Sequence, residues 1–228
     1  MASTTSRRVG LAVGAQRTVP LSIWAIAVLL PVGPAAIAVL RLILPYYTAS
    51  DSEGMVAAVD ANPGQQSAVL WLAYVGILTL VPGVFAAAGV CRSAAPRLTA
   101  WALALSVPGY LSLGMLVGPD HLLWSTHAAG LSAGESAAVV SAAHPSVDVA
   151  IGVFVLGHVI GTVLLGLALL RSGRIPAWAG WAVAVSQPLH FVATVILGSP
   201  KVDFVAWTLT ASGMAMVARA LVRDPSAV

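Results

Sequence analysis

The chain has 228 residues, of which 59% are hydrophobic and only 8% charged, and its formal net charge is +3. Soluble globular proteins carry far more charge, so this composition excludes that class and favours an integral membrane protein. One cysteine, Cys91, permits no disulfide within the chain. No phosphate-binding loop or metalloprotease motif occurs, and membrane topology accounts for the basic residues, so no nucleic-acid partner is expected.

The chain begins with a basic stretch rich in Ser and Thr that lacks an apolar core. We expect residues 1–20 to form a flexible cytoplasmic tail. Residues 21–221 are predicted to form a single all-α transmembrane domain, followed by a cytoplasmic tail over 222–228. The apolar stretches are long enough to cross a bilayer six times. The predicted helices cover residues 21–45, 67–90, 98–118, 148–170, 177–198 and 203–221.

A Trp-Ala-x-Ala-x-x-x-Pro phrase occurs in the first, third and fifth predicted helices. It begins at Trp24, Trp101 and Trp181. Proline removes a backbone donor, and such a break is tolerated in a membrane only where protein or water surrounds it. The repeated spacing predicts three related helical hairpins, bent at Pro31, Pro108 and Pro188 around a shared interior space. The alternative is a compact bundle without a cavity, since Ala and Gly allow close packing.

Two of the connections contain a capping box, a Ser followed three residues later by a Glu, which marks the start of a helix. The pairs are Ser50 with Glu53 and Ser132 with Glu135. Each is followed by an Ala/Val stretch that ends at a proline-containing turn. We therefore expect two short outer helices that lie over the interior space. The third hairpin has only a tight turn at this place.

The charges orient the predicted helices. Nine of the eleven Lys and Arg residues fall on one side of this topology, and seven of the eight acids fall on the other. Basic residues stay preferentially on the cytoplasmic side of a membrane. Both termini are therefore expected in the cytoplasm, in a multi-pass protein of the cell inner (plasma) membrane.

Two histidines interrupt the repeat at matching depths. Counted from the basic turns, His158 and His190 both lie roughly 20 Å from the cytoplasmic end, on adjacent helices. Two level imidazoles can ligate a haem or a metal, and Gly157 and Gly161 would let a flat ring approach. The alternative is a pair of neutral histidines that hydrogen-bond a neighbouring helix and bind no cofactor.

Arg41 lies near the outer end of the first helix, where a basic residue is disfavoured. It must reach the outer surface or pair with a carboxylate. The acids expected at that level are Asp51, Asp60, Asp148 and Asp203. Asp148 and Asp203 begin helices, where the helix N-terminus stabilises an anion. Asp51 and Asp60 are freer to face the interior, where burial favours the protonated form.

The most distinctive phrases in the sequence are Arg41-Leu-Ile-Leu-Pro-Tyr-Tyr, Gly157-His158 and the Trp-Ala and Ser-x-Pro phrases. With these features it resembles a family of small six-span bacterial membrane proteins, mostly of unknown function. In size, helix count and scattered acids and aromatics at helix ends, it resembles more loosely the small integral-membrane terpene cyclases. That second resemblance implies proton-initiated cyclisation of a lipid-soluble isoprenoid in an outward-facing pocket.

A cyclase needs a desolvated carboxylic acid and aromatic faces that stabilise a carbocation. The expected catalytic group is Asp51 or Asp60, with Arg41 and Tyr46 beside it. The expected substrate-binding residues are Tyr110, Trp124, Asp148, His158, His190, Asp203 and Trp207. This hypothesis requires no metal and no cofactor.

Three other functions are consistent with the same sequence. One is a haem or metal protein that uses His158 and His190. Another is a small-molecule transporter with the proline breaks as hinges around a midplane site. The last is a structural partner subunit without a site of its own. The expected partners are the lipid bilayer and a lipid-soluble small molecule, and association into a homo-oligomer is left open.

Overall fold

The computed structural model of the chain describes residues 21–49 and 51–224, whose regular structure is entirely helical. Six of the described helical segments are long and apolar enough to cross a membrane, which supports a multi-pass membrane protein. The predicted tail over 1–20, most of the tail over 222–228 and Ser50 lie outside the described residues.

The membrane-spanning segments agree with most of the predicted ranges. They are α1 (Leu21–Ile43), α3 (Pro63–Cys91), α4 (Pro96–Ala128), α6 (Ser146–Ser172), α7 (Ala177–Phe191) with its continuation η1 (Val192–Leu197), and α8 (Pro200–Arg223). The predicted end of the third span at residue 118 is wrong, because α4 continues to Ala128 through Pro119. A proline disturbs only the preceding turn. Beyond it, Leu123 and Thr126 keep one face of the helix buried.

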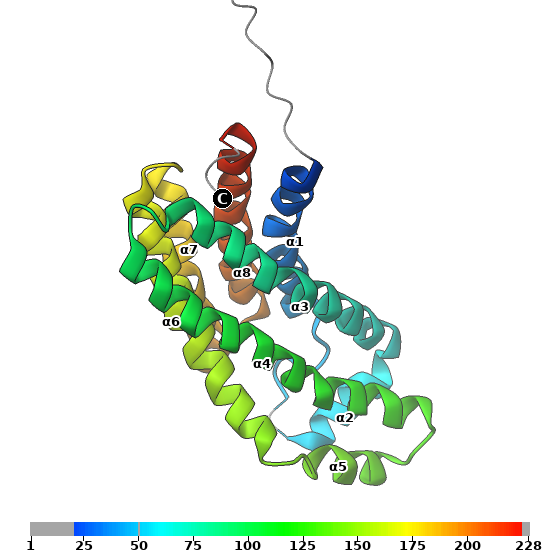
Figure 1. Cartoon of the computed structure of the whole chain (residues 1–228). Helices are drawn as coiled ribbons and strands as arrows, with labels where there is room; N and C mark the ends of the chain where they lie inside the picture. Colours follow the sequence, from blue (N-terminus) through cyan, green and yellow to red (C-terminus); the bar gives the residue numbers. More distant parts are fainter. Residues whose placement is uncertain (1–20, 50, 225–228) are drawn as a thin grey trace, which may run out of the picture.

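The spans form a closed ring in chain order. Each packs against the next, and α8 returns to pack along α1. Figure 1 shows these first and last helices side by side, with the beginning of α1 and the end of α8 at the same end of the molecule. Small residues allow the close approach: a Cβ added to Gly157 would lie 2.6 Å from the backbone oxygen of Leu105, and one added to Gly166 would lie 2.5 Å from the backbone nitrogen of Ala184.

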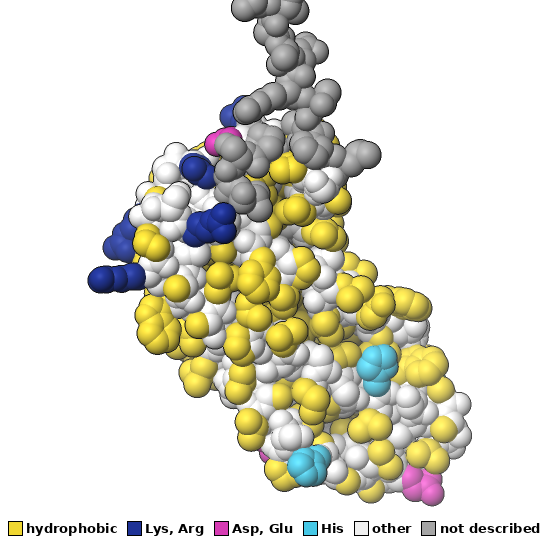
Figure 2. All heavy atoms as spheres, in the orientation of Figure 1, with side chains coloured by type: hydrophobic (Ala, Val, Ile, Leu, Met, Phe, Trp, Pro, Cys, Tyr) yellow, Lys and Arg dark blue, Asp and Glu magenta, His cyan; other side chains and the backbone are white. Residues whose placement is uncertain are grey.

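The two ends of the bundle differ in charge. We call the end with the α3–α4 and α6–α7 turns the basic end, and the end with α2 (Ser52–Ala61) and α5 (Ala133–Ser141) the cap end. In Figure 2 the visible Lys and Arg side chains gather at the basic end, and the visible histidines lie toward the cap end. The basic end carries Arg92, Arg97, Arg171, Arg174, Arg219 and Arg223.

The two short helices pack against each other and form a small core at the cap end. This core contains Val56, Val59, Leu123, Ala137 and Val140, with Tyr46 and Met55 packed against it. The predicted capping box of α5 is confirmed, since Ser132 N donates to Glu135 Oε2 at 2.9 Å and Glu135 N donates to Ser132 Oγ at 3.4 Å. The Ser132 hydroxyl and amide lower the pKa of the Glu135 carboxyl.

Helix α2 begins differently from the prediction. Its N-cap is Asp51, whose side chain accepts a hydrogen bond from Gly54 N at 2.7 Å, so the cap lies one residue after the predicted Ser50. Aspartate is as good an N-cap as serine, because its carboxylate oxygen satisfies a free amide of the first turn. The side chain of Asp51 is thereby committed to the helix end.

The three repeated prolines lie in different local structures. Pro31 and Pro108 are inside α1 and α4, which remain α-helical on both sides. Pro188 is near the end of α7, and the chain then passes into the π-helical segment η1. Gly198 follows with a φ of +56°, a conformation that favours glycine, and it forms the predicted tight turn into α8. The equivalence of the three hairpins stays a prediction.

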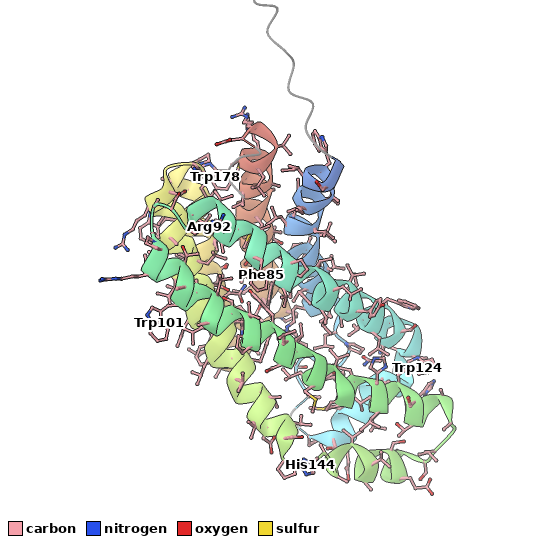
Figure 3. The ribbon with its side chains drawn as sticks, viewed as in Figure 1. Phe85, Arg92, Trp101, Trp124, His144 and Trp178 are labelled. Atoms are coloured by element: carbon pink, nitrogen blue, oxygen red, sulfur yellow. The ribbon has the colours of Figure 1, made fainter. Side chains whose placement is uncertain are left out.

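Aromatic side chains on the outside follow the pattern of a membrane protein. Figure 3 labels Trp101 and Trp178 near the basic end and Trp124 toward the cap end. Trp101 is 64% exposed and Trp178 is 54% exposed, although both lie in apolar helices. Exposed tryptophans near the ends of apolar helices are typical of residues at the membrane–water interface.

Candidate functional site

The carboxylate of Asp203 is the centre of a buried polar cluster near the cap end. Its side chain is 0% exposed. Oδ2 accepts hydrogen bonds from Arg41 Nε at 2.6 Å and from the Tyr47 hydroxyl at 2.9 Å, and Oδ1 lies 2.5 Å from His190 Nδ1. Of the two alternatives for Arg41, the structure shows the pairing with an acid, and the partner is Asp203.

Local structure places these groups together. Ser199 caps α8 by accepting from Val202 N at 3.4 Å, which puts Asp203 in the first turn of the helix. Asp203 thus faces the end of α7, which carries His190. The segment after α1 supplies Tyr47, and Arg41 lies 4.6 Å from the centroid of its ring. Burial raises the pKa of the Tyr47 phenol, so the hydroxyl stays protonated and donates to the carboxylate.

His190 Nδ1 has a second polar neighbour. The indole nitrogen of Trp207, one turn after Asp203 on α8, lies 3.3 Å from the same imidazole nitrogen. A carboxylate oxygen only accepts, so at 2.5 Å from Asp203 Oδ1 the Nδ1 atom carries a hydrogen and donates to the carboxylate. This contact fixes the orientation of the imidazole, and the Trp207 ring packs beside it with 5.5 Å between the ring centroids.

His158 lies directly beside His190, as predicted, with 5.4 Å between the ring centroids. Its Nδ1 is 2.5 Å from the backbone oxygen of Phe154, and its ring stacks on the Phe154 ring at 4.0 Å. Its Nε2 is buried and has no hydrogen-bond partner among the described residues. A buried polar atom without a partner is costly, so this nitrogen marks a place for a water, a proton or a ligand atom.

The polar interior continues from the histidines toward the basic end. The Tyr110 hydroxyl is 3.0 Å from that of Thr162. On the other side, Gln187 Nε2 donates to Thr210 at 2.9 Å, and Thr210 donates to Ser186 at 2.8 Å. All five side chains are buried in the helix bundle. The centre of the ring is therefore polar at this depth, which is rare in a membrane domain and usually functional.

The two glycines beside His158 pack against α4. A Cβ on Gly157 would lie 2.9 Å from the Cα of Gly109, and one on Gly161 would lie 2.6 Å from the backbone nitrogen of Ser106. Both glycines allow α4 to approach α6 closely, so protein atoms of α4 contact α6 at these two positions. In the described part of the chain, no group of three or more His, Cys, Asp or Glu side chains is placed to hold a metal ion. Haem binding by the histidine pair stays a prediction that an absorbance spectrum can test.

The residues predicted for a cyclase are only partly brought together. The cluster contains Arg41, Tyr110, His158, His190, Asp203 and Trp207. Asp51 caps α2, and Asp60 Oδ1 lies 2.8 Å from His127 Nδ1 at the surface. Asp148 is exposed in the first turn of α6. Neither predicted catalytic acid therefore faces the buried cluster.

Two aromatic residues of the predicted site also lie elsewhere. Tyr46 packs against the small core at the cap end, and Trp124 lines a separate cavity between α3 and α4. The adjacent Tyr47 is the one that reaches Asp203. The sequence shows both tyrosines side by side, and only the turn after α1 decides which of them points inward.

Sequence reasoning also missed Thr194, whose hydroxyl lies 3.4 Å from both His190 Nδ1 and Asp203 Oδ2. Its spacing was a usable indication, because a residue four positions after His190 returns to the same face of a helix.

Comparison of the chain with protein-family models, curated proteins and solved structures finds no match. No family is assigned, and the chemistry of the cluster is the basis for a function.

Proposed function

We propose that the protein spans the plasma membrane with both termini in the cytoplasm, and that it couples proton binding at His190 and Asp203 to the transport of a small solute. The observation that carries the proposal is the continuous series of contacts from Tyr47 and Arg41 through Asp203 to His190, with His158 beside it. Chains of buried Asp and His side chains are typical of proton pathways in membrane transporters.

The charges of the cluster suit reversible proton binding. Arg41 and Asp203 compensate one another, so the cluster changes between neutral and singly positive when His190 gains a proton. Histidine is the side chain whose charge ordinarily changes between about pH 5 and 8. The second imidazole, His158, lies beside His190 with 5.4 Å between the ring centroids, a separation that one bridging water could span.

The helix that carries His190 is irregular where a transporter would need it. The α-helical part of α7 ends at Phe191, and the π-helical segment follows at once. Interrupted helices at the level of the binding site are a recurrent feature of secondary transporters, and π-helical turns are common at functional sites. The segment thus offers a local change of backbone next to His190.

Packing toward the basic end supports a pathway that opens toward the cap end. A Cβ on Gly213 would lie 2.5 Å from Val183 Cγ2, and one on Gly180 would lie 2.6 Å from Leu170 Cγ. The packing between α6, α7 and α8 is therefore tight on the side of the cluster that faces the basic end. Arg41, with 21% of its side chain exposed, forms the more accessible side of the cluster.

The cyclase hypothesis has less support from the geometry. Such an enzyme needs a neutral carboxylic acid in a dry pocket. Asp51 and Asp60 lie at the surface, and the buried Asp203 is bound to a guanidinium. The cyclase hypothesis assigned the protonation of an alkene to Asp51 or Asp60, and neither of them lies in a dry pocket.

Reconstitution tests the transport proposal. Purified protein is placed in vesicles that contain a pH-sensitive dye, and low-molecular-weight fractions of a cell extract are added under an imposed pH gradient. At least one fraction is expected to change the internal pH faster with the wild type than with His190→Gln. His144→Gln removes an exposed histidine and should behave as the wild type. Identical traces for wild type and His190→Gln with every fraction would refute the proposal.

A further inference from the structure

The side chain of Thr194 has four polar neighbours in the cluster. Thr194 is an exposed residue of η1. Its Oγ1 lies 3.4 Å from Arg41 Nη2, 3.4 Å from His190 Nδ1, 3.4 Å from Asp203 Oδ2 and 3.5 Å from the Tyr47 hydroxyl. One exposed hydroxyl thus contacts groups from α1, from the turn after it, from α7 and from α8.

These four distances are nearly equal, and all of them are long. A strong hydrogen bond between a hydroxyl and an oxygen has a separation of about 2.7–2.8 Å, and a hydroxyl has only one hydrogen to donate. His190 Nδ1 carries a hydrogen of its own, so the Thr194 hydrogen goes to Asp203 Oδ2. The Thr194 oxygen accepts from Arg41. Several weak contacts therefore hold this side chain, and a small movement of the backbone changes all of them.

The position of the hydroxyl depends on the irregular backbone of η1. Thr194 belongs to the π-helical segment, which begins two residues after His190. In a π-helical turn the backbone hydrogen bond spans five residues instead of four, and such turns are frequent at functional sites. A change from π-helical to α-helical geometry rotates the side chains of the segment about its axis. Such a change would move the Thr194 hydroxyl relative to Asp203.

We propose that Thr194 couples the backbone of η1 to proton binding at His190, a role that rests on the proposed proton-coupled function. While His190 is neutral, the Thr194 hydroxyl donates to the Asp203 carboxylate and holds η1 in its π-helical form. A proton from solvent adds at Nε2 of His190, because Nδ1 already carries a hydrogen. The cationic ring then draws the carboxylate more strongly and repels the hydroxyl hydrogen beside it. The contact between Thr194 and Asp203 weakens, and η1 opens more easily.

Other charged and titratable side chains surround the same contact. They come from α1 and the turn after it, from α4, α6 and α8, and they are Arg41, Tyr47, Tyr110, Asp120, His158, Lys201 and Asp203. Arg41 keeps its charge at every pH of interest, and Lys201 is exposed in the first turn of α8. Because several groups could respond to pH, the test must show that the response comes from His190 and passes through Thr194.

Hydrogen exchange of the η1 amides tests the coupling on the purified full-length protein in detergent, without any transport. Exchange is followed at about pH 5 and about pH 8 and corrected for the intrinsic effect of pH on amide exchange. Wild-type η1 is expected to exchange about threefold or more faster at the lower pH, relative to α5, because a hydrogen bond to a charged group is weakened. Thr194→Val lacks the hydroxyl and should exchange at the faster rate at both pH values. Thr194→Ser should restore the difference. His190→Gln, which stays neutral, should exchange at the slower rate at both.

Thr208→Val is the matched control, because Thr208 is also exposed and its hydroxyl donates to the backbone oxygen of Phe204 in its own helix at 2.7 Å. It should behave as the wild type. Wild-type η1 that exchanges no faster at the lower pH would overturn the inference, as would a full pH response in Thr194→Val or in His190→Gln. Transport by a wild type whose η1 does not respond would refute the coupling alone. A response of η1 in a protein that fails the reconstitution test would refute transport alone.

Discussion

The Asp203 carboxylate is buried in a membrane domain, where removal of an anion from water costs several kcal/mol. Arg41 supplies a compensating charge from α1, and Tyr47 adds a neutral donor from the following turn. His190 approaches the other carboxylate oxygen from α7. One carboxylate thus holds three separate segments, so its loss should affect stability as well as any proton chemistry.

Arg41→Gln and Asp203→Asn are each expected to lower the free energy of unfolding by about 3–5 kcal/mol, since each leaves one charge buried without its partner. The double variant should lose less than the sum, because neither charge is then stranded. Denaturant or thermal unfolding in detergent measures these differences. Asp148→Asn, at an exposed acid, should cost less than about 1 kcal/mol. If the double variant lost as much free energy of unfolding as the two single variants together, the result would contradict a coupled pair.

At the scale of the elements, α4 and α6 cross with almost no space between their backbones. Gly109 and Gly157 face one another at this crossing: a Cβ on Gly109 would lie 2.7 Å from the backbone nitrogen of His158, and one on Gly157 would lie 2.9 Å from the Cα of Gly109. Backbone atoms cannot move aside as a side chain can. The position of His158 in the cluster therefore depends on two residues that have no side chain.

Gly157→Ala is expected to lower the free energy of unfolding by about 1–3 kcal/mol, because the added methyl group forces α4 and α6 apart. Gly152 lies on the same helix with open space around it and provides the matched control. Gly152→Ala should be neutral or stabilising by up to about 1 kcal/mol, since alanine favours the helix. The comparison is made by thermal unfolding in detergent. A loss in Gly152→Ala as large as that in Gly157→Ala would mean that the crossing is not the cause.

The extent of what could be predicted differs between elements and contacts. A long apolar run identifies α3, and a capping box identifies the start of α5. Both signals can be read from the sequence because each lies within about 30 consecutive residues. The end of α4 was missed because Pro119 and Asp120 resemble loop residues, and only packing at the cap end keeps the helix regular there. The partner of Arg41 could not be chosen among four acids, because the choice is made when α8 packs along α1.

At the scale of the whole molecule, an even number of spans brings both ends of the described chain to the basic end. The orientation in the membrane follows from that end if basic residues remain in the cytoplasm. The only cysteine, Cys91, is buried, so single cysteines introduced at the surface can report the two sides without interference.

His144→Cys is expected to react with a membrane-impermeant maleimide on intact cells, because the turn between α5 and α6 lies outside in the proposed orientation. Arg174→Cys, in the turn between α6 and α7, should react only after the membrane is opened. The wild type, with its buried cysteine, gives the background. The reverse pattern of labelling would invert the proposed orientation and would place the cluster nearer the cytoplasm.

Closure of the ring between α1 and α8 also constrains how the protein is made. Arg41 precedes Asp203 by 162 residues, so it leaves the ribosome before the last helix exists. At about 5–20 residues per second, the arginine waits roughly 10–30 s for its carboxylate. During that time four further spans must enter the bilayer while the guanidinium remains at the interface or bound to another anion. A ribosome that stalls before α8 would release a chain with an unpaired arginine, which is a suitable mark for removal by quality-control proteases.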